Sequence, residues 1–350
     1  MTATTSPAVP QIDGGLRPIR LRLALTLLGY GGLALAVCLL APLVGSTSIS
    51  VARAFDRSIP FADNLDAQIF FLARMPRVLA GAVVGAALAA AGVVLQALLR
   101  NPLATPFTLG VSAGAALGAM LAISAGAAAV GFGPLSPVPL ASLAGAFVAA
   151  AIVYALATRP GRPMSTAVLL LAGVTLNSFF SALILFVQYM SDFAEAYRTV
   201  RWLMGDLDVG GFGPIAAVLP LVLVAFALFA TLPAPLNLLS VGADTAATRG
   251  VDVARTQRLA FVSAALATSG AVALAGPIGF VGIVVPHLVR LMTGVDHRVS
   301  LPASALFGAA FLVACDLVAR TVLAPVEVPV GVVTAMIGGP FFLWLLVRKA

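Results

Sequence analysis

Long uncharged apolar stretches, separated by short polar segments, make up most of this chain. About 20 consecutive apolar residues form a helix that crosses the hydrocarbon core of a bilayer, so we expect the stretches to be membrane spans. Residues 101–158 are long enough for two spans, with a break predicted at 131–139. One span each is predicted in residues 23–52, 78–99, 163–191, 209–243, 299–315 and 328–347.

The apolar stretch at 259–289 needs a separate argument, because it is long for one span and short for two. Arg255 and Arg258 precede it, and Arg290 and Arg298 follow it. Because arginine and lysine collect on the cytoplasmic side of membrane proteins, both flanks are predicted to be cytoplasmic and the stretch to cross twice. Residues 276–277, a Gly-Pro pair, form the natural break. The pattern therefore predicts ten spans, with both chain ends in the cytoplasm.

Composition and charge agree with a polytopic membrane protein. Hydrophobic residues make up 61% of the chain and charged residues 9%, whereas soluble domains carry about 25% charged residues. Ten spans place thirteen of the 20 lysine and arginine residues inside and nine of the 13 acidic residues outside, as the orientation rule expects. The predicted fold class is all-α, with residues 1–22 a disordered cytoplasmic tail and residues 23–350 a single transmembrane domain.

A polar segment at residues 236–258 interrupts the apolar pattern. It holds two short semi-apolar pieces, 236–241 and 245–253, with Gly242 and Gly250 between and within them. Glycines at such places stop or turn a helix, so the segment predicts two short helices beside the membrane. With its three arginines it is either a docking surface for a cytoplasmic partner or an ordinary positive-inside loop, and the pattern alone favours neither.

Two arginines, Arg74 and Arg77, are predicted to lie just outside the second span, against the orientation rule. They could grip carboxylates of a partner, or anchor the helix by reaching for the interface. Arg320 is predicted on the same side and could join them. Its spacing from Asp316 also predicts a local ion pair.

Several functions are disfavoured by what the sequence contains. Lys349 is the sole lysine, and a P-loop needs a lysine after its glycines, so the chain is not its own P-loop ATPase. The motif GVSAG places Ser112 in a possible nucleophile setting, but no strand precedes it and a protease needs a histidine base. No Cys/His cluster has metal-ligand spacing. An ion-coupled carrier stays open, because Asp316 and Glu327 are acids near a span.

Five separate stretches together resemble the FecCD family of ABC-importer permeases, whose members import iron–siderophore, haem and cobalamin. One stretch alone would be weak evidence, but all five occur in the family's order. They begin RMPRVLAG, LLLAGVTLN, RWLMGDL, LAGPIGFVG (with GVDHRVSLP after it) and VEVPVGVV, and lie at residues 74–118, 169–183, 201–207, 274–302 and 326–346.

The resemblance implies a type II importer fold and a set of partners. The chain would pair with a second copy, two ATP-binding cassette subunits and an extracytoplasmic substrate-binding protein, in the inner membrane among its lipids. ATP and Mg would be bound by the ATPase subunits, so this chain would be no enzyme, would hold no cofactor or metal, and would bind no nucleic acid. Iron–siderophore leads among the substrates because it is the commonest in the family.

The resemblance also assigns roles to residues. Residues 236–258 would form the two coupling helices that contact the ATPase, although Arg249 stands where relatives often have leucine. Arg74, Arg77 and Arg320 would face acidic residues of the binding protein. The coupling residues would be Gly242, Asp244, Arg249, Gly250 and Asp252, and the cytoplasmic gate would be formed by Asn101, Leu103, Ser165 and Thr166.

Overall fold

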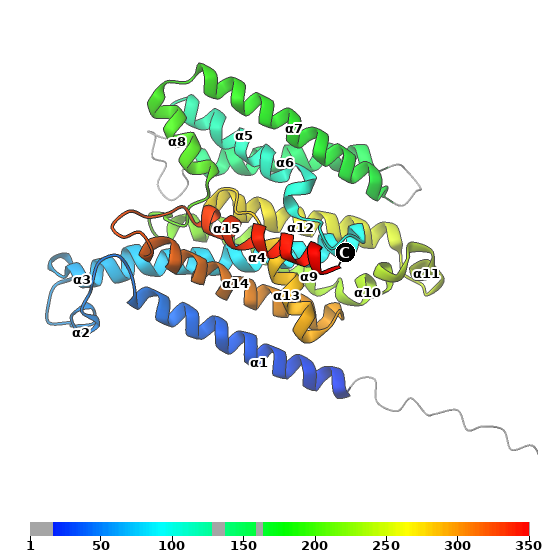
Figure 1. The fold of residues 1–350 in the computed structure, drawn as a ribbon, viewed down its shortest axis with the longest axis horizontal. Helices are drawn as coiled ribbons and strands as arrows, with labels where there is room; N and C mark the ends of the chain where they lie inside the picture. The colour runs from blue at the N-terminus through cyan, green and yellow to red at the C-terminus, as the bar shows by residue number, and fades with distance from the viewer. Residues whose placement is uncertain (1–16, 128–136, 159–163, 350) are drawn as a thin grey trace, which may run out of the picture.

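The computed structural model describes residues 17–127, 137–158 and 164–349, and the regular structure in this part of the chain is helical (Figure 1). The helices are α1 (Arg17–Leu40), α2 (Val51–Ala54), α3 (Leu65–Gln68), α4 (Met75–Leu99), α5 (Val111–Ser124), α6 (Pro137–Ala157), α7 (Thr166–Met190), α8 (Phe193–Leu203), α9 (Gly213–Ala230), α10 (Pro233–Val241), α11 (Ala243–Thr248), α12 (Val253–Ala275), α13 (Val281–Thr293), α14 (His297–Thr321) and α15 (Val330–Lys349).

The apolar helices match the predicted spans. In the described residues, seven helices are long and apolar enough to cross a membrane, and three shorter apolar helices, α5, α13 and α15, complete the ten. The break predicted in 259–289 is confirmed: α12 ends at Ala275 and α13 begins at Val281. Gly276 makes this turn with φ +68°, in the left-handed region that glycine tolerates best. Most of the predicted break at 131–139 lies outside the described residues.

Two predicted boundaries need correction. The first helix begins at Arg17 rather than after residue 22. Residues 17–22, with their arginines, therefore belong to this helix and not to the predicted tail. Residues 1–16 lie outside the described part of the chain. The second span is also longer than predicted, because α3, a π-helical stretch at Ile69–Arg74 and α4 form one continuous helix from Leu65 to Leu99.

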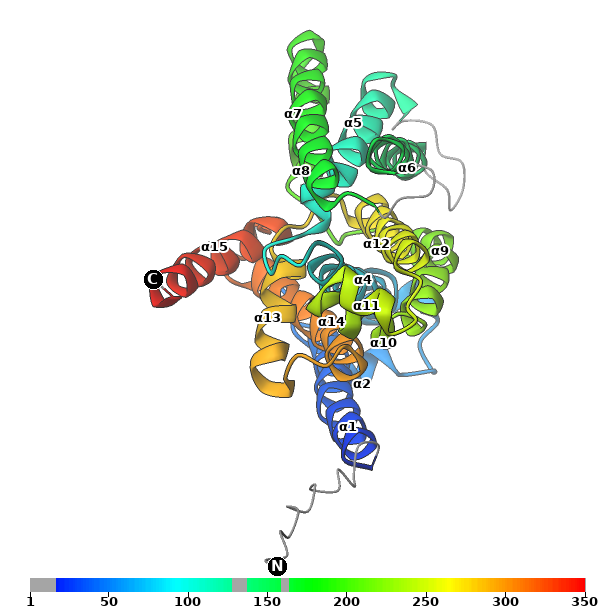
Figure 2. The same ribbon diagram turned by 90° about the vertical axis from the view of Figure 1, so that its right-hand side faces the viewer.

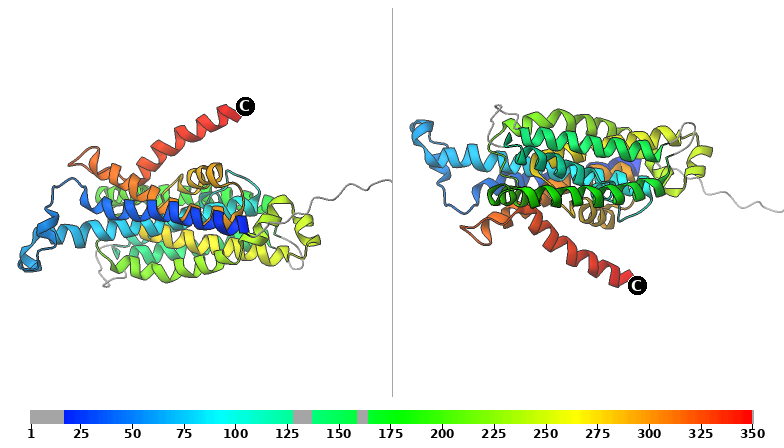
Figure 3. Two further views of the ribbon diagram at one scale, coloured as in Figure 1. Left: turned by 90° about the horizontal axis from the view of Figure 1, so that it is seen from below. Right: turned by 90° about the horizontal axis from the view of Figure 1, so that it is seen from above.

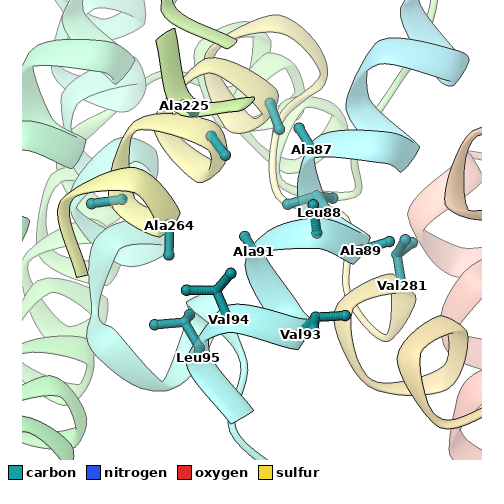
Figure 4. Close-up of a cluster of buried hydrophobic side chains, with 14 of the residues drawn as sticks. Ala87, Leu88, Ala89, Ala91, Val93, Val94, Leu95, Ala225, Ala264 and Val281 are labelled. Atoms are coloured by element: carbon teal, nitrogen blue, oxygen red, sulfur yellow. The ribbon is translucent and has the colours of Figure 1, made fainter. Parts of the chain in front are cut away.

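Helix α4 lies at the centre of the bundle. It packs against α9, α12, α13 and α14, and most of its residues are buried. In Figure 4 its alanine and valine side chains point towards Ala225 of α9, Ala264 of α12 and Val281 of α13. Small side chains let these helices approach closely, which is how helices associate where lipid removes most of the hydrophobic drive.

Glycines create the closest contacts around α4. A Cβ atom built on Gly85 would lie 2.2 Å from the carbonyl oxygen of Gly308 on α14. One built on Gly92 would lie 2.1 Å from the carbonyl oxygen of Gly282 on α13. The GxxxG spacing at 81–85 therefore contributes one of its glycines to a real helix crossing, where a side chain would force the helices apart.

The remaining helices surround this core unequally. Helices α5, α6 and α7 form a group on one side of it, and α1 lies on the opposite side (Figure 2). Helix α15 projects away from the bundle in both views of Figure 3. Helices α7 and α15 expose large apolar side chains, among them Leu171 (70% exposed), Tyr189 (89%) and Met336 (70%).

The bundle has two ends with different contents. Helices α10 and α11 lie at one end, together with the start of α1, and α2, α3 and α8 lie at the other (Figure 1). We call these the α11 end and the α8 end. The α11 end carries the predicted coupling and gate residues, and the α8 end carries the predicted docking arginines.

Candidate functional site

The segment predicted to couple to an ATPase folds as two short helices, α10 and α11. Gly242, with φ +155°, separates them, and Gly250, with φ +82°, follows α11. Two short helices are therefore present, as the pieces 236–241 and 245–253 predict. The second helix, however, lies at Ala243–Thr248 and ends before residue 253. Residues 253–258 are the first turns of α12, because the Asp252 carboxylate caps that helix by accepting a hydrogen bond from the Arg255 amide at 2.9 Å.

The predicted coupling residues divide into exposed side chains and structural positions. Asp244 and Arg249 are exposed, and both can reach a partner. A Cβ atom on Gly250 would meet no atom within 4 Å, but its positive φ favours glycine. Asp252 holds the start of α12 as described. The contact surface offered by this loop therefore consists mainly of Asp244, Arg249 and their exposed neighbours.

One face of helix α10 packs against the bundle. Leu236 and Leu239 are buried there, at 0% and 2% exposed. Between them, the Asn237 side chain donates to Asp296 Oδ1 at 2.7 Å. Its own oxygen accepts from the His297 backbone amide at 2.9 Å. Sequence reasoning missed Asn237, and the signal that could have found it is the Asp-His pair in GVDHR, which begins α14.

Asp296 sits in an environment that favours its charged form. Burial alone would raise the pKa of this carboxyl group, but the hydrogen bond from Asn237, the Arg298 amide and the charges of Arg298 and His297 outweigh it. The net result is a pKa below the ordinary carboxyl range. The carboxylate is therefore ionised at neutral pH, where it also caps α14 by accepting from the Arg298 amide at 2.9 Å.

The predicted gate residues lie in two turns of the α11 end. The Asn101 side chain accepts a hydrogen bond from the Leu103 amide at 2.9 Å and closes the turn after α4. Ser165 caps α7, which Thr166 begins. Next to Ser165, the Met164 amide donates to Gln257 of α12 at 2.7 Å. These contacts hold the predicted gate residues locally, and their role as a gate stays a prediction.

At the α8 end, Arg77 is the centre of a buried ion cluster. Its Nε lies 2.9 Å from Asp316 Oδ1, and its Nη1 lies 2.6 Å from Glu327 Oε2. Arg320 approaches the other oxygen of Asp316 at 3.8 Å, as the i, i+4 spacing predicts. The Asp316 side chain is 1% exposed and that of Glu327 is 45% exposed. One carboxylate is therefore internal and the other borders solvent.

The three predicted docking arginines are buried in the interior of the protein. Arg74, Arg77 and Arg320 are 6%, 9% and 3% exposed. Arg74 donates to the Pro42 carbonyl oxygen at 2.9 Å and also to that of Thr47, and Arg320 donates to that of Ala41. The alternative of helix anchors that reach for the interface is wrong for these side chains, because protein carboxylates and carbonyls surround them. Docking stays a prediction.

A cavity of about 520 Å³ lies beside this cluster. Arg77 and Glu327 form part of its wall, and so do Arg201 of α8 and the residues Asp206 and Asp208 that follow it. The Arg77–Glu327 pair therefore borders a space that a partner's side chain could enter.

The motif GVSAG has a structural explanation. Ser112 is 3% exposed in the first turn of α5. Both histidines are engaged elsewhere: His297 contacts Asn237 through its ring nitrogen Nδ1 at 2.6 Å, and the His287 ring packs against Phe341. In the part of the chain that the structure describes, no three His, Cys, Asp or Glu side chains gather as metal ligands would. The motif therefore contributes to helix packing.

Comparison with known proteins decides the family. The model of the FecCD transport family matches residues 33–348, which is nearly the whole chain. The chain belongs to the FecCD transport family. It is accordingly a transmembrane permease of an ABC importer, and the five stretches that carry the resemblance all lie within the matched residues.

Individual relatives and a solved structure agree with this assignment. The chain is 47% identical over 274 residues to the cobalamin import system permease of Halobacterium salinarum, covering 78% of this chain and 72% of the relative. It is 37% identical to the hemin transport system permease of Yersinia pestis, covering 90% and 94%. A structure described as a metal-chelate type ABC transporter, inward-facing, shares 33% identity and a TM-score of 0.80, covering 93% and 100%.

Proposed function

We propose that this FecCD permease works as a pair of copies, with two ATP-binding cassette subunits at the α11 end and a substrate-binding protein at the α8 end. The family match over residues 33–348 carries the proposal. The α11 end is then cytoplasmic, as the distribution of arginine and lysine along the sequence predicts. Both chain ends are cytoplasmic in this arrangement.

The exposed faces of α7 and α15 support a paired permease. Leu171, Val174 and Phe179 on α7 are between 55% and 70% exposed, and Met336 and Leu343 on α15 are 70% and 65% exposed. A second copy that covers parts of these faces would leave the rest to line a path between the copies. Asn177 and Ser178, exposed on α7, are the polar groups that we expect to lie at this path.

The docking of a binding protein at the α8 end would use the buried ion cluster. A carboxylate of the partner could enter the cavity beside Arg77 and replace Glu327, whose side chain is 45% exposed. Asp316, which is 1% exposed, would stay in place and keep Arg77 oriented. A charge-assisted bond to arginine is strong and directional, which suits recognition between two proteins.

The proposed substrate is a bulky metal chelate of the cobalamin, haem or ferric siderophore class. Relatives named for cobalamin, hemin and ferric enterobactin transport support this class. We propose cobalamin as the first substrate to test, because the relative at 47% identity is named for it. Residues 166–190 of α7 and 330–347 of α15 carry no charged side chain, so a path along these helices would offer a large chelate no strong trap.

Co-purification tests the assembly. The chain, expressed with the cassette subunit from its own organism, is compared with a variant in which Asp244 and Arg249 are alanine. Both side chains are exposed, and the variant leaves the cap at Asp252 and the turn at Gly250 intact. We expect the native chain to retain the ATPase and the variant to lose most of it.

A matched control is Arg57→Ala, an exposed arginine in the segment between α2 and α3. These two helices lie at the α8 end (Figure 1), so this variant should retain the ATPase. Equal retention by all three chains would show that the loop is not the coupling surface. Absence of any bound ATPase would contradict the importer assembly and favour an ion-coupled carrier.

A further inference from the structure

Asn237 joins two elements that are far apart in the sequence. It lies on α10, and its side chain bonds to Asp296 at 2.7 Å and to the His297 backbone amide at 2.9 Å. The His297 ring adds a contact of 2.6 Å to the same oxygen. We call Asn237, Asp296 and His297 the α10–α14 latch. One side chain thus uses both its donor and its acceptor to hold the beginning of α14.

The latch includes the residue that caps the N-terminus of α14. Asp296 Oδ1, which accepts from Asn237, also accepts from the Arg298 amide and caps the helix. His297 is the first residue of α14 and is 8% exposed. A displacement of α10 therefore cannot leave the start of α14 in place without breaking these bonds. Breaking them would leave partly buried polar groups without these partners, which is unfavourable.

Helix α14 connects the latch to the ion cluster at the opposite end of the bundle. It runs from His297 to Thr321 and carries Asp316 and Arg320 near its far end. Along its length it crosses α4 where Gly85 and Gly308 bring the two backbones together. Tightly packed helices of this kind move as units and do not bend freely.

We propose that Asn237 is a positioning residue that makes α14 follow the movement of α10. In this assignment, which rests on the proposed importer function, the ATPase moves α10 and the latch passes that movement to α14. The leucines beside Asn237 make apolar contacts, which still allow α10 to slide along its neighbours. The latch makes directional hydrogen bonds, which fix the position of α10 relative to α14. Removal of the latch should therefore uncouple α14 from α10 without releasing the ATPase.

The test measures the two elements separately in the complete complex with its ATPase subunits. Cys38 and Cys315 are replaced by alanine, and a spin label is placed either at Val241→Cys on α10 or at Val295→Cys before α14, both of which are exposed sites. Distances between the two copies of a label are measured without nucleotide and with ADP and vanadate. In the parent complex we expect nucleotide to shift both distances.

In Asn237→Ala we expect the Val241→Cys shift to persist and the Val295→Cys shift to fall to about half or less. The matched control is Thr231→Ala, which removes one local hydrogen bond ahead of α10 and should leave both shifts unchanged. An unchanged Val295→Cys shift in Asn237→Ala would overturn the proposal. So would loss of both shifts, because Asn237 would then serve to hold α10 on the ATPase.

A second variant covers the case in which Asn237→Ala does not fold. Asn237→Asp puts a second carboxylate against Asp296 and should reduce the Val295→Cys shift. An unchanged Val295→Cys shift in this variant would count against the latch. A parent complex without ATPase or nucleotide-driven shifts would instead contradict the importer function itself.

Discussion

Arg77 is held by two carboxylates of different exposure, and this difference decides what each substitution costs. Asp316 lies in the interior at 1% exposed, whereas the Glu327 side chain is 45% exposed. Water can solvate Glu327 when Arg77 is lost, but it cannot reach Asp316 without opening the bundle. A buried charge without its partner is far more costly than an exposed one.

We therefore predict that Arg77→Gln destabilises the folded protein by about 3–5 kcal/mol, since it leaves Asp316 buried without its main partner. Glu327→Gln should cost less than about 1 kcal/mol. The measurement is thermal unfolding of the detergent-solubilised chain. Adding Asp316→Asn to Arg77→Gln should recover part of the loss, and an equal loss in the Arg77 and Glu327 variants would contradict the assignment of the cluster.

The pKa of Asp296 predicts a dependence on pH at the opposite end. Because the folded structure lowers this pKa, the charged carboxylate adds stability above its unfolded pKa, about 3.9 for aspartate. That stability is lost as the pH falls through the folded value. Thermal unfolding measured from neutral to acidic pH should show a smaller acid loss in Asp296→Asn than in the native chain. Identical pH profiles would show that Asp296 is not held as described.

At the scale of elements, the packing of α4 against α14 depends on glycine at the point where the two helices cross. Gly85 and Gly308 face each other so closely that a Cβ atom on either would overlap the carbonyl oxygen of the other, at 2.2 Å and 2.4 Å. This crossing brings the α4 and α14 backbones into direct contact between the latch and the ion cluster. Any added side chain at this crossing must separate them.

We predict that Gly85→Val lowers stability by about 1–3 kcal/mol or more, the cost of overpacking a close contact. Gly32→Val on α1 is the matched control, because a Cβ atom there would meet no atom within 4 Å. Thermal unfolding of the two variants, purified in the same detergent, makes the comparison. Comparable losses in both would mean that helix propensity, and not the crossing, sets the cost.

At the scale of the whole molecule, the sequence predicted the positions of the apolar helices, the break in 259–289 and the two short helices after α9. These features depend on apolar length, arginine distribution and glycine, all of which act locally and can be counted. The burial of Arg77 could not be predicted in this way, because its partners Asp316 and Glu327 lie about 240–250 residues away in the sequence. Asn237 was missed for the same reason.

The predicted roles follow a similar division. The family could be named from five stretches because each is local, and the match over residues 33–348 confirms it. The i, i+4 spacing predicts the Arg320–Asp316 pair, but charge alone gives no sign that Arg77 is buried between two carboxylates. Only the fold shows that Arg77 and its partner Glu327 line the same cavity.

The central claim is that this chain is the permease of an ATP-driven importer. The measurement that tests it most directly is uptake of radiolabelled cyanocobalamin, hemin and a ferric siderophore into proteoliposomes that contain the chain, its ATPase and its binding protein. We predict uptake of one chelate that requires ATP and the binding protein and persists when ion gradients are collapsed. Uptake by the chain alone, driven by a proton or sodium gradient and indifferent to ATP, would contradict the account.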